Sequence, residues 1–468
     1  LLRWNPRFLT AVDDPPDAPL LLRLEALTSD EAAALRAVAA AVRARVVLGP
    51  RGALVAGTRP QQAALARRLA SGEGISARDL ILTPGNVQRM TDRLSHLRGA
   101  AMKLGQMISL EPGEFLPPEL QSIFAQLRSS AHFMPPSQLS ASLSSAWGPD
   151  WRRHFSQFET TPIAAASIGQ VHRGILSSGR PVAVKVQYPG VLQSIDSDID
   201  NVATFLRLSG LLPAGLDIAP HLAEAKRQLR EEADYLREAE EMRRFGSLLA
   251  DDDRFVVPAP VEDLLRPTVL PMDFVEGAPL ETLAHAPQTQ RDAAMQAISE
   301  LALRELFVFG HMQTDPNFAN YLWRPSDGRV ALLDFGAVRP VSPESARDYH
   351  LLLQATLGGD PKAVRDALMQ MRYLSRAQTE RYGRTLDEMT RVVLDHVLKA
   401  PERLVDFSDR GPLVEIRERA VPIFADRALW ALPAPDKMFL QRKITGLALL
   451  SMKLRVRMPL SAMLRDYA

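Results

Sequence analysis

The sequence predicts an α+β protein in which a strand-rich segment comes before a larger helical one. Strand-like runs occupy residues 155–191, with a turn at 177–180 (SSGR) that predicts a hairpin. Residues 193–250 have helical composition, and residues 254–276 are again strand-like. Most of the remaining chain is helical in pattern, apart from the run VALLDFGAV at 330–338.

Composition limits the class of protein. The chain has 468 residues, of which 46% are hydrophobic, which is enough for two or three packed domains. It contains no cysteine, so disulfides and thiolate catalysis are excluded. Lys and Arg number 56 against 55 Asp and Glu, and this balance gives no electrostatic reason to expect a nucleic-acid partner.

The apolar segments are too short to cross a membrane. The run ITGLALLSM at 444–452 is about half the length that a transmembrane helix needs. No secretory signal is recognised, so we expect a cytoplasmic protein. Residues 439–460 alternate apolar and basic residues, which fits either a core helix with solvated basic residues, the favoured alternative, or a helix lying on anionic lipid at the inner membrane. Peripheral membrane contact therefore remains open.

The N-terminal third is expected to be helical. Residues 30–48 and 57–76 have helical composition, and apolar residues recur at helical spacing over 87–110. The pattern predicts an N-terminal helical and linker region, a helical extension, a strand-rich lobe and a helical lobe, at residues 1–80, 81–155, 156–276 and 277–468.

Four segments together predict a site for phosphoryl transfer. They are an alanine-rich loop at 164–172, Lys185, MQTDPNFAN at 312–320 and LLDFGA at 332–337. Each is weak alone, but such sites need a loop over the phosphates, a lysine, a catalytic aspartate and metal ligands in this order. The segments therefore predict a bilobal protein-kinase-like fold that binds ATP and Mg²⁺.

Each residue has an expected role in that site. Lys185 would hold the α- and β-phosphates, and Glu238 would pair with it, although a solvated acidic helix explains Glu238 equally well. Asp315 comes five residues before Asn320, the spacing of a kinase catalytic loop, and is the candidate catalytic residue. Asn320 and Asp334 offer oxygen ligands suited to Mg²⁺.

The chain resembles the UbiB/AarF-type atypical kinase-like proteins of coenzyme Q biosynthesis over roughly residues 90–460. The resemblance rests on KLGQ at 103–106, AAASIGQVH at 164–172, VAVKVQYPGV at 182–191, EEADYLREA at 231–239, MQTDPNFAN at 312–320 and LLDFGAVR at 332–339. The glutamine and threonine before Asp315 resemble the mitochondrial branch of that family.

The resemblance implies further site residues. An alanine-rich nucleotide loop replaces the glycine-rich one, with contacts expected from Ala164, Ala165, Ala166, Ser167, Gly169 and Gln170. A helix with the KxGQ motif, here Lys103 and Gln106, would cover the active site, and Lys103 would meet Glu232 and Asp234. Because alanine restricts backbone angles more than glycine, this loop would limit ordinary protein phosphorylation.

Two features of the sequence argue against a conventional protein kinase. Asn317 stands where protein kinases place a lysine near the γ-phosphate. After Asp334 the chain returns to a helical pattern within about ten residues, which leaves no room for a peptide-binding platform.

We therefore expect an enzyme, a magnesium-dependent ATPase or small-molecule kinase that supports ubiquinone biosynthesis. Its partners would be a nucleotide, a lipid or quinone precursor and other biosynthetic enzymes. The alternative is a nucleotide-sensing pseudokinase that acts as a scaffold for those enzymes.

Overall fold

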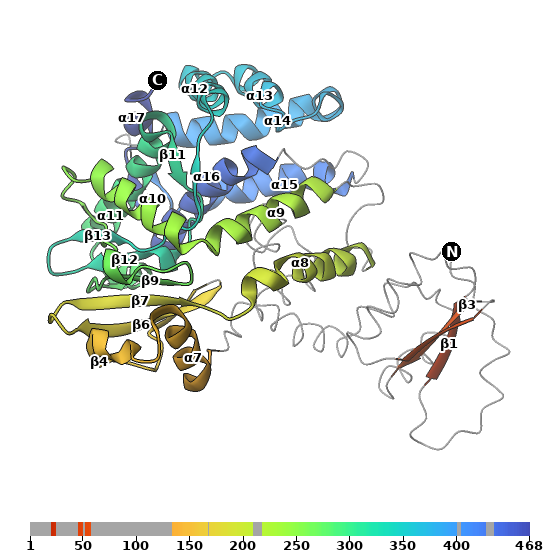
Figure 1. The fold of residues 1–468 in the computed structure, drawn as a ribbon. Coiled ribbons are helices and arrows are strands. Elements are labelled where there is room, and N and C mark those ends of the chain that lie inside the picture. Colours follow the sequence, from red (N-terminus) through yellow and green to blue (C-terminus); the bar gives the residue numbers. More distant parts are fainter. Residues whose placement is uncertain are drawn as a thin grey trace. The chain divides into compact units, whose positions relative to one another are not determined.

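The computed structural model describes residues 20–24, 45–49, 52–57, 133–166, 168–208, 218–399, 404–426 and 435–468. The chain forms two compact units (Figure 1). One unit combines Leu1–His132 with Leu192–Leu229, and the other combines Phe133–Val191 with Arg230–Ala468. Each unit is described by itself.

The first unit contains a small sheet that the sequence did not predict. Strands β1 (Leu20–Leu24), β2 (Arg45–Gly49) and β3 (Gly52–Gly57) pair antiparallel in the order β1-β3-β2. The expected helix over 30–48 is therefore wrong at residues 45–48, where the run RVVL favours a strand over the alanine-rich pattern before it. The predicted helices at 57–76 and 87–110 lie outside the described residues.

Among the described residues, this unit also contains most of two helices, as the helical pattern of residues 193–250 predicts. They are α8 (Val191–Leu208) and α9 (Ala219–Glu232). The Lys226 ammonium lies 2.7 Å from a carboxylate oxygen of Asp200, which links α9 to α8.

The second unit begins with a five-stranded antiparallel sheet, shown in orange, yellow and green in Figure 1. Its strands are β4 (Phe155–Phe158), β5 (Ala164–Ala166), β6 (Gly169–Leu176), β7 (Pro181–Gln187) and β9 (Val269–Asp273). The order is β4-β6-β7-β9, and β5 pairs with the other end of β6. The expected hairpin with its turn at 177–180 is confirmed as β6 and β7.

One face of this sheet forms a hydrophobic core with helix α7 (Pro136–Trp147). Val182, Val184 and Val186 of β7 are fully buried there, together with Leu139 and Leu143 of α7. Successive side chains of a strand point to opposite faces, so Lys185 faces away from α7. The expected domain boundaries place α7 in the extension, whereas its apolar face packs on this sheet.

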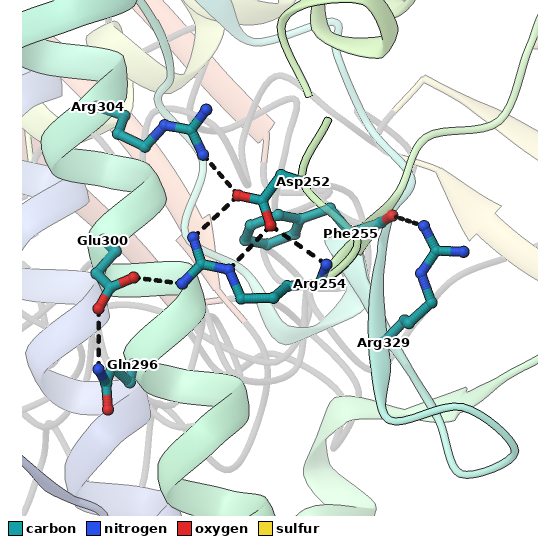
Figure 2. A network of polar contacts seen from close by, with 7 residues as sticks. All are labelled: Asp252, Arg254, Phe255, Gln296, Glu300, Arg304 and Arg329. Carbon is teal, nitrogen blue, oxygen red and sulfur yellow. Dashed lines mark hydrogen bonds and ion pairs between the residues drawn. The ribbon is translucent and has the colours of Figure 1, made fainter. Parts of the chain in front are cut away.

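Helix α10 (Tyr235–Leu248) follows, and its N-terminus is capped by Asp234, whose carboxylate accepts the Arg237 N–H. Short elements β8 (Phe255–Val256) and η4 (Glu262–Leu264) lead to β9. Partly buried polar contacts tie this connection to the helical lobe (Figure 2). Asp252 binds Arg254 at 2.9 Å and Arg304 at 2.6 Å, and Arg254 also binds Glu300.

The rest of this unit is mainly helical, as expected, with the blue helices α12–α14 at the end away from the sheet in Figure 1. Its helices are α11 (Gln288–Arg304), α12 (Pro343–Gly358), α13 (Pro361–Gln370), α14 (Arg376–Leu398), α15 (Gly411–Ala425), α16 (Pro435–Leu454) and α17 (Leu460–Arg465). Its 3₁₀ and π elements are η5 (Leu280–His285), η6 (Glu305–Phe309) and η7 (Phe318–Asn320).

Short strands also cross this helical part. Strand β13 (Arg329–Leu332) was expected, but β10 (Ala278–Pro279), β11 (His311–Gln313), β12 (Tyr321–Arg324), β15 (Val405–Asp406) and β16 (Arg457–Met458) were not. β11 pairs with β14 (Val338–Pro340), and β12 pairs with β13, both antiparallel. These pairs bring residues 311–324 beside residues 329–340.

Helix α16 packs into the core, as the favoured alternative for residues 439–460 expected, but the solvated position expected for its basic residues is wrong for Lys443. Leu440, Leu447, Leu450 and Leu454 are buried along it, and the Lys443 side chain is only 2% exposed. A helix lying on lipid would turn its basic residues to the headgroups. Of the described helices, none combines the length and apolar character required to span a bilayer.

Candidate functional site

The candidate site begins with a buried ion pair between β7 and α10. The Lys185 ammonium donates to both carboxylate oxygens of Glu238 at 2.8 Å, and it lies 3.7 Å from Asp334 Oδ2. The alternation of β7 turns Lys185 toward α10, where Glu238 is fully buried in the first turn. A solvated acidic face is therefore excluded for Glu238.

Charge and burial act together on this pair. Burial by itself disfavours the Lys185 ammonium, but Asp334 and Glu238 outweigh it and raise the pKa of Lys185. Burial raises the pKa of Glu238 to about 7, while Lys185 opposes that shift. The Lys185 ammonium also lies 5.2 Å from the centre of the Tyr235 ring, a cation–π contact. Lys185 thus remains charged in contact with Glu238, Asp334 and the Tyr235 ring.

Helix α10 is also fixed to the segment around Asp334. Glu238 accepts a hydrogen bond from the backbone of Phe335, and Arg237 donates to the carbonyl oxygens of Gly336, at 3.0 Å, and Val338. The Phe335 ring is buried and packs against Phe245 of α10, with ring centres 5.4 Å apart. Glu238 therefore connects Lys185 of β7 to the backbone of Phe335, the residue that follows Asp334.

The catalytic-loop candidates lie together between β11 and η7. Asn320 donates from Nδ2 to the Asp315 carbonyl oxygen at 2.9 Å and to Asp315 Oδ2 at 3.3 Å. Asn317 accepts the Ala319 N–H in its side chain and caps η7. Asn317, which stands where protein kinases have a lysine, thus stabilises the turn that follows Asp315.

Backbone contacts join this loop to the Asp334 segment. Thr314, which is fully buried, donates from Oγ1 to the Ala337 carbonyl oxygen at 2.8 Å. Leu333, the residue before Asp334, donates its N–H to the Asn320 carbonyl oxygen at 3.0 Å. The structure therefore brings Asp315, Asn320 and Asp334 into one region, and Asp334 meets Lys185.

The alanine-rich segment is a strand. Ala164, Ala165 and Ala166 form β5 and pair with β6, and Ala166 lies opposite Gly169. Ser167 lies outside the described residues. A Cβ at Gly169 would come within 2.4 Å of the Val186 carbonyl oxygen and 2.7 Å of the Tyr235 hydroxyl. Glycine is thus required at 169 by close packing within the protein.

Gln170 does not lie where a nucleotide contact requires it. Its side chain is fully buried, accepts the Met134 N–H at 2.7 Å and contacts His172 Nε2 at 2.8 Å. On β6 it neighbours Val186, whereas Val171 neighbours Lys185, so Gln170 faces α7. We correct its expected role from nucleotide ligand to anchor of the chain before α7.

The gating residues are only partly placed. Lys103 and Gln106 lie outside the described residues. Glu232, at the end of α9, is 7% exposed, and Asp234 caps α10 just before the helix that carries Glu238. The contact expected between Lys103 and this acidic pair stays a prediction.

Sequence reasoning missed several residues that support the site. Arg237 and Tyr235 sit beside Glu238 in the recognised EEADYLREA motif, and their position there was the available signal. Arg442 and Lys443 were assigned to solvent or lipid because basic residues are seldom buried. In the structure, Arg442 donates to the Thr314 carbonyl oxygen at 3.1 Å, and Lys443 is buried.

The donor set fits a magnesium ion that also binds phosphate. Asp334 Oδ1 accepts the Gly336 N–H, and Asp334 offers a second oxygen beside Lys185. Asn320 uses its amide nitrogen toward Asp315, and its carbonyl is the oxygen type that Mg²⁺ takes. The described residues hold no group of three His, Cys, Asp or Glu side chains placed to bind a metal. Mg²⁺ commonly uses one or two protein oxygens and completes its shell with phosphate and water.

Comparison with known proteins agrees with this architecture. The chain is 36% identical to the atypical kinase coq-8, mitochondrial, of Caenorhabditis elegans over 82% of its own length and 51% of the relative. It is 35% identical to the atypical kinase COQ8, mitochondrial, of Saccharomyces cerevisiae, over 85% of this chain and 79% of the relative. The chain thus spans about half the length of the nematode protein.

A solved structure gives the fold independently. The complex of Rv3197 with erythromycin from Mycobacterium tuberculosis superposes with a TM-score of 0.53 at 24% identity, over 88% of this chain and 98% of that one. The sequence model of the ABC1 atypical kinase-like domain matches residues 126–368. The chain therefore belongs to the ABC1 atypical kinase-like family and has its kinase-like fold.

Proposed function

We propose that this protein binds Mg²⁺–ATP or Mg²⁺–ADP and acts as an ATPase or small-molecule kinase in support of ubiquinone biosynthesis. The observation that carries the proposal is the arrangement of Lys185, Glu238 and Asp334. A charged, oriented lysine beside an aspartate with an open carboxylate oxygen is what a nucleotide phosphate and its metal require.

Each residue would then act through position and charge. Lys185, held by Glu238, would bind the nucleotide phosphates, and Asp334 with Asn320 would hold the metal, which supplies charge neutralisation when bound. Asp315 would orient the attacking hydroxyl or water and accept its proton. Alanines Ala164–Ala166 would cover the phosphates as strand β5.

The acceptor is expected to be small or to be water. Helix α12 begins at Pro343, nine residues after Asp334, and Ser342 caps it by accepting the Ser345 N–H. Of the intervening residues, Val338–Pro340 pair with β11 as β14. A protein kinase uses a long segment here to bind a peptide, so this short connection favours a lipid or quinone precursor, or hydrolysis.

A second candidate function is a nucleotide-sensing scaffold for biosynthetic enzymes. The observation that favours it is Asn317, whose side chain caps η7 where a protein kinase has a lysine near the γ-phosphate. A scaffold would bind nucleotide through Lys185 without turning it over.

Asp334→Asn tests the assignment and separates the two candidates. The substitution removes the charge that holds the metal but keeps the side-chain shape, so we expect the fold to persist while magnesium-dependent turnover is lost. Asp366→Asn is the control, because Asp366 is an exposed partner of Lys362 on α13. Undiminished ATP turnover in Asp334→Asn would contradict the role of Asp334. Nucleotide binding without turnover in the wild type would favour the scaffold.

Location and partners follow from the relatives and stay proposals for this chain. The COQ8-type relatives are named mitochondrial, whereas the sequence by itself led us to expect a cytoplasmic protein. We propose an association with the biosynthetic enzymes of the ubiquinone pathway. Leu440, Leu447, Leu450 and Leu454 of α16 are buried, so we propose that the expected peripheral membrane contact uses another part of the chain.

A further inference from the structure

A buried cation lies beneath the proposed catalytic loop. Lys443, on α16, is 2% exposed, and its ammonium lies 3.4 Å from a carboxylate oxygen of Glu305. The same ammonium lies 3.4 Å from Gln313 Oε1 and 3.4 Å from the Tyr321 hydroxyl. Gln313 and Tyr321 flank the loop that contains Asp315. The nucleotide-binding role proposed above does not use this cation.

Gln313 connects the cation to Asp315. Its Oε1 atom also accepts the Asp315 N–H at 3.2 Å. Two donors converge on this oxygen, which fixes the orientation of the amide. Lys443 is therefore linked through one side chain to the backbone of the proposed catalytic residue.

The neighbours of Lys443 on α16 contact the loop on either side. Arg442 donates to the Thr314 carbonyl oxygen from Nε at 3.2 Å and from Nη2 at 3.1 Å. Gly446 lies against Pro316, where an added Cβ would come within 2.1 Å of the proline ring. One face of α16 thus meets the residues before and after Asp315.

Glu305 reaches Lys443 from a distorted helix end. It begins the π-helical turn η6, which follows α11, and it is 1% exposed. Such turns occur often at functional sites, because the added residue redirects the side chains. Glu305 also accepts a hydrogen bond from the Gln313 backbone. Burial disfavours the Lys443 ammonium, but Glu305 and Tyr321 outweigh it and raise the pKa of Lys443, which stays charged.

We propose that Lys443 is a positioning residue that, with Glu305, holds Gln313 and through it the backbone of Asp315. The catalytic part of this inference rests on the function proposed for Asp315. Stability is a weak reason for such a pair, because replacing a buried ion pair by apolar groups is often neutral or stabilising. The link through Gln313 to Asp315 offers a functional reason to bury the two charges.

The test removes both charges together, since breaking only one leaves the other buried and unpaired. The variant is Lys443→Met with Glu305→Gln, which keeps the approximate side-chain volumes. The matched control is Lys437→Met with Asp348→Asn. Lys437 is also on α16 and is buried, but its ammonium binds Asp348 of α12 at 2.7 Å.

Hydrogen exchange of the Asp315 amide, without nucleotide, is the first measurement. We expect this amide to exchange faster in the Lys443 and Glu305 double variant and at the wild-type rate in the control. Only the double variant loosens Gln313, the acceptor of the Asp315 N–H. ATP turnover is the second measurement. We expect kcat to fall about 10- to 100-fold at unchanged nucleotide affinity, since a shift of about 1 Å in a catalytic group has effects of this size.

Two results would overturn the proposal. One is wild-type exchange at Asp315 in the double variant, and the other is an equal loss of kcat in the control. If the double variant does not fold, Gln313→Met replaces it, because this change keeps the ion pair but removes the acceptor of the Asp315 N–H. Faster exchange of the Asp315 amide is then expected, and wild-type exchange would contradict the proposal. If the wild type does not turn over ATP, the exchange measurement still decides the positioning role separately from the proposed function.

Discussion

Replacing Gly446 with alanine would place a methyl group where α16 passes Pro316, the residue directly after Asp315. The added Cβ would lie 2.1 Å from Pro316 Cγ and 2.7 Å from its Cβ. The proline ring is bonded to the backbone on both sides, so it cannot move aside as the end of a long side chain can. The loop itself must shift.

The structure gives the size of that shift. Ordinary van der Waals contact begins at 3.4 Å, so the ring must move by about 1.3 Å, the difference from 2.1 Å, unless α16 moves instead. Overpacking of this kind costs about 1–3 kcal/mol, and the alanine regains up to about 1 kcal/mol of helix propensity. The expected net loss of stability thus lies between about 0 and 3 kcal/mol, whereas a displacement of about 1 Å at Asp315 lowers kcat about 100-fold.

The assay compares ATP turnover and the free energy of unfolding in wild type, Gly446→Ala and Gly246→Ala. Gly246 is the control because it also lies in a helix, α10, and an added Cβ there would meet only Val257, at 3.9 Å. We expect Gly246→Ala to keep activity and to gain up to about 1 kcal/mol of stability. Wild-type kcat in Gly446→Ala would refute the reasoning that α16 sets the position of the loop.

Three other predictions follow from the site and from Figure 2. Lys185→Ala should weaken nucleotide binding about tenfold or more, since it removes a charged hydrogen-bond donor; the pKa of Glu238, already raised to about 7, would then rise further and the acid would take up a proton. Unchanged affinity and turnover would make Lys185 an ordinary strand residue. Ala166→Gly should loosen the end of β5 and change the relative affinities for ATP and ADP. Titration of wild type and variant with both nucleotides in Mg²⁺ would detect this change. Equal affinities of wild type and variant for each nucleotide would mean that the alanines serve only packing. Asp252→Asn should lose about 1–2 kcal/mol of stability at pH 7, after allowance for the partial exposure of Arg254. Because Arg254 lowers the pKa of Asp252 from 3.8 to about 2, this contribution is complete above pH 3.8 and disappears as the pH falls through 2. Denaturant unfolding at pH 5 and pH 3 would check it, and a difference between wild type and variant that does not shrink at pH 3 would count against it.

The sequence predicted the site well where local pattern and chemistry coincide. The hairpin around 177–180 follows from strand patterns on either side of a turn, and it places Lys185. Asp315 and Asn320, which are five residues apart in the sequence, form a direct hydrogen bond in the structure. Glu238 was only one of several carboxylates on its helix. Glu241 is buried there too, so the hydrogen bonds of Glu238 with Lys185 decided between them.

Other residues could not be assigned from pattern alone. Gln170 belongs to the recognised alanine-rich segment, but the alternation of β6 in its sheet turns it toward α7 and Met134. Residues 45–48 continue an alanine-rich run, yet they form a strand because β3 pairs with them. In both cases the partner that decides the outcome lies in another part of the chain.

The sequence by itself determined the α+β class, the family and the order of the motif segments, because these depend on local periodicity and on residue types at fixed spacing. Only the tertiary structure decided what α16 does. In one dimension its basic residues favour a core helix with these residues in solvent, or a helix lying on lipid. Lys443 can stay charged when buried because Glu305, 138 positions earlier in the numbering, supplies the opposite charge at 3.4 Å, and such a pair exists only after the helices have packed.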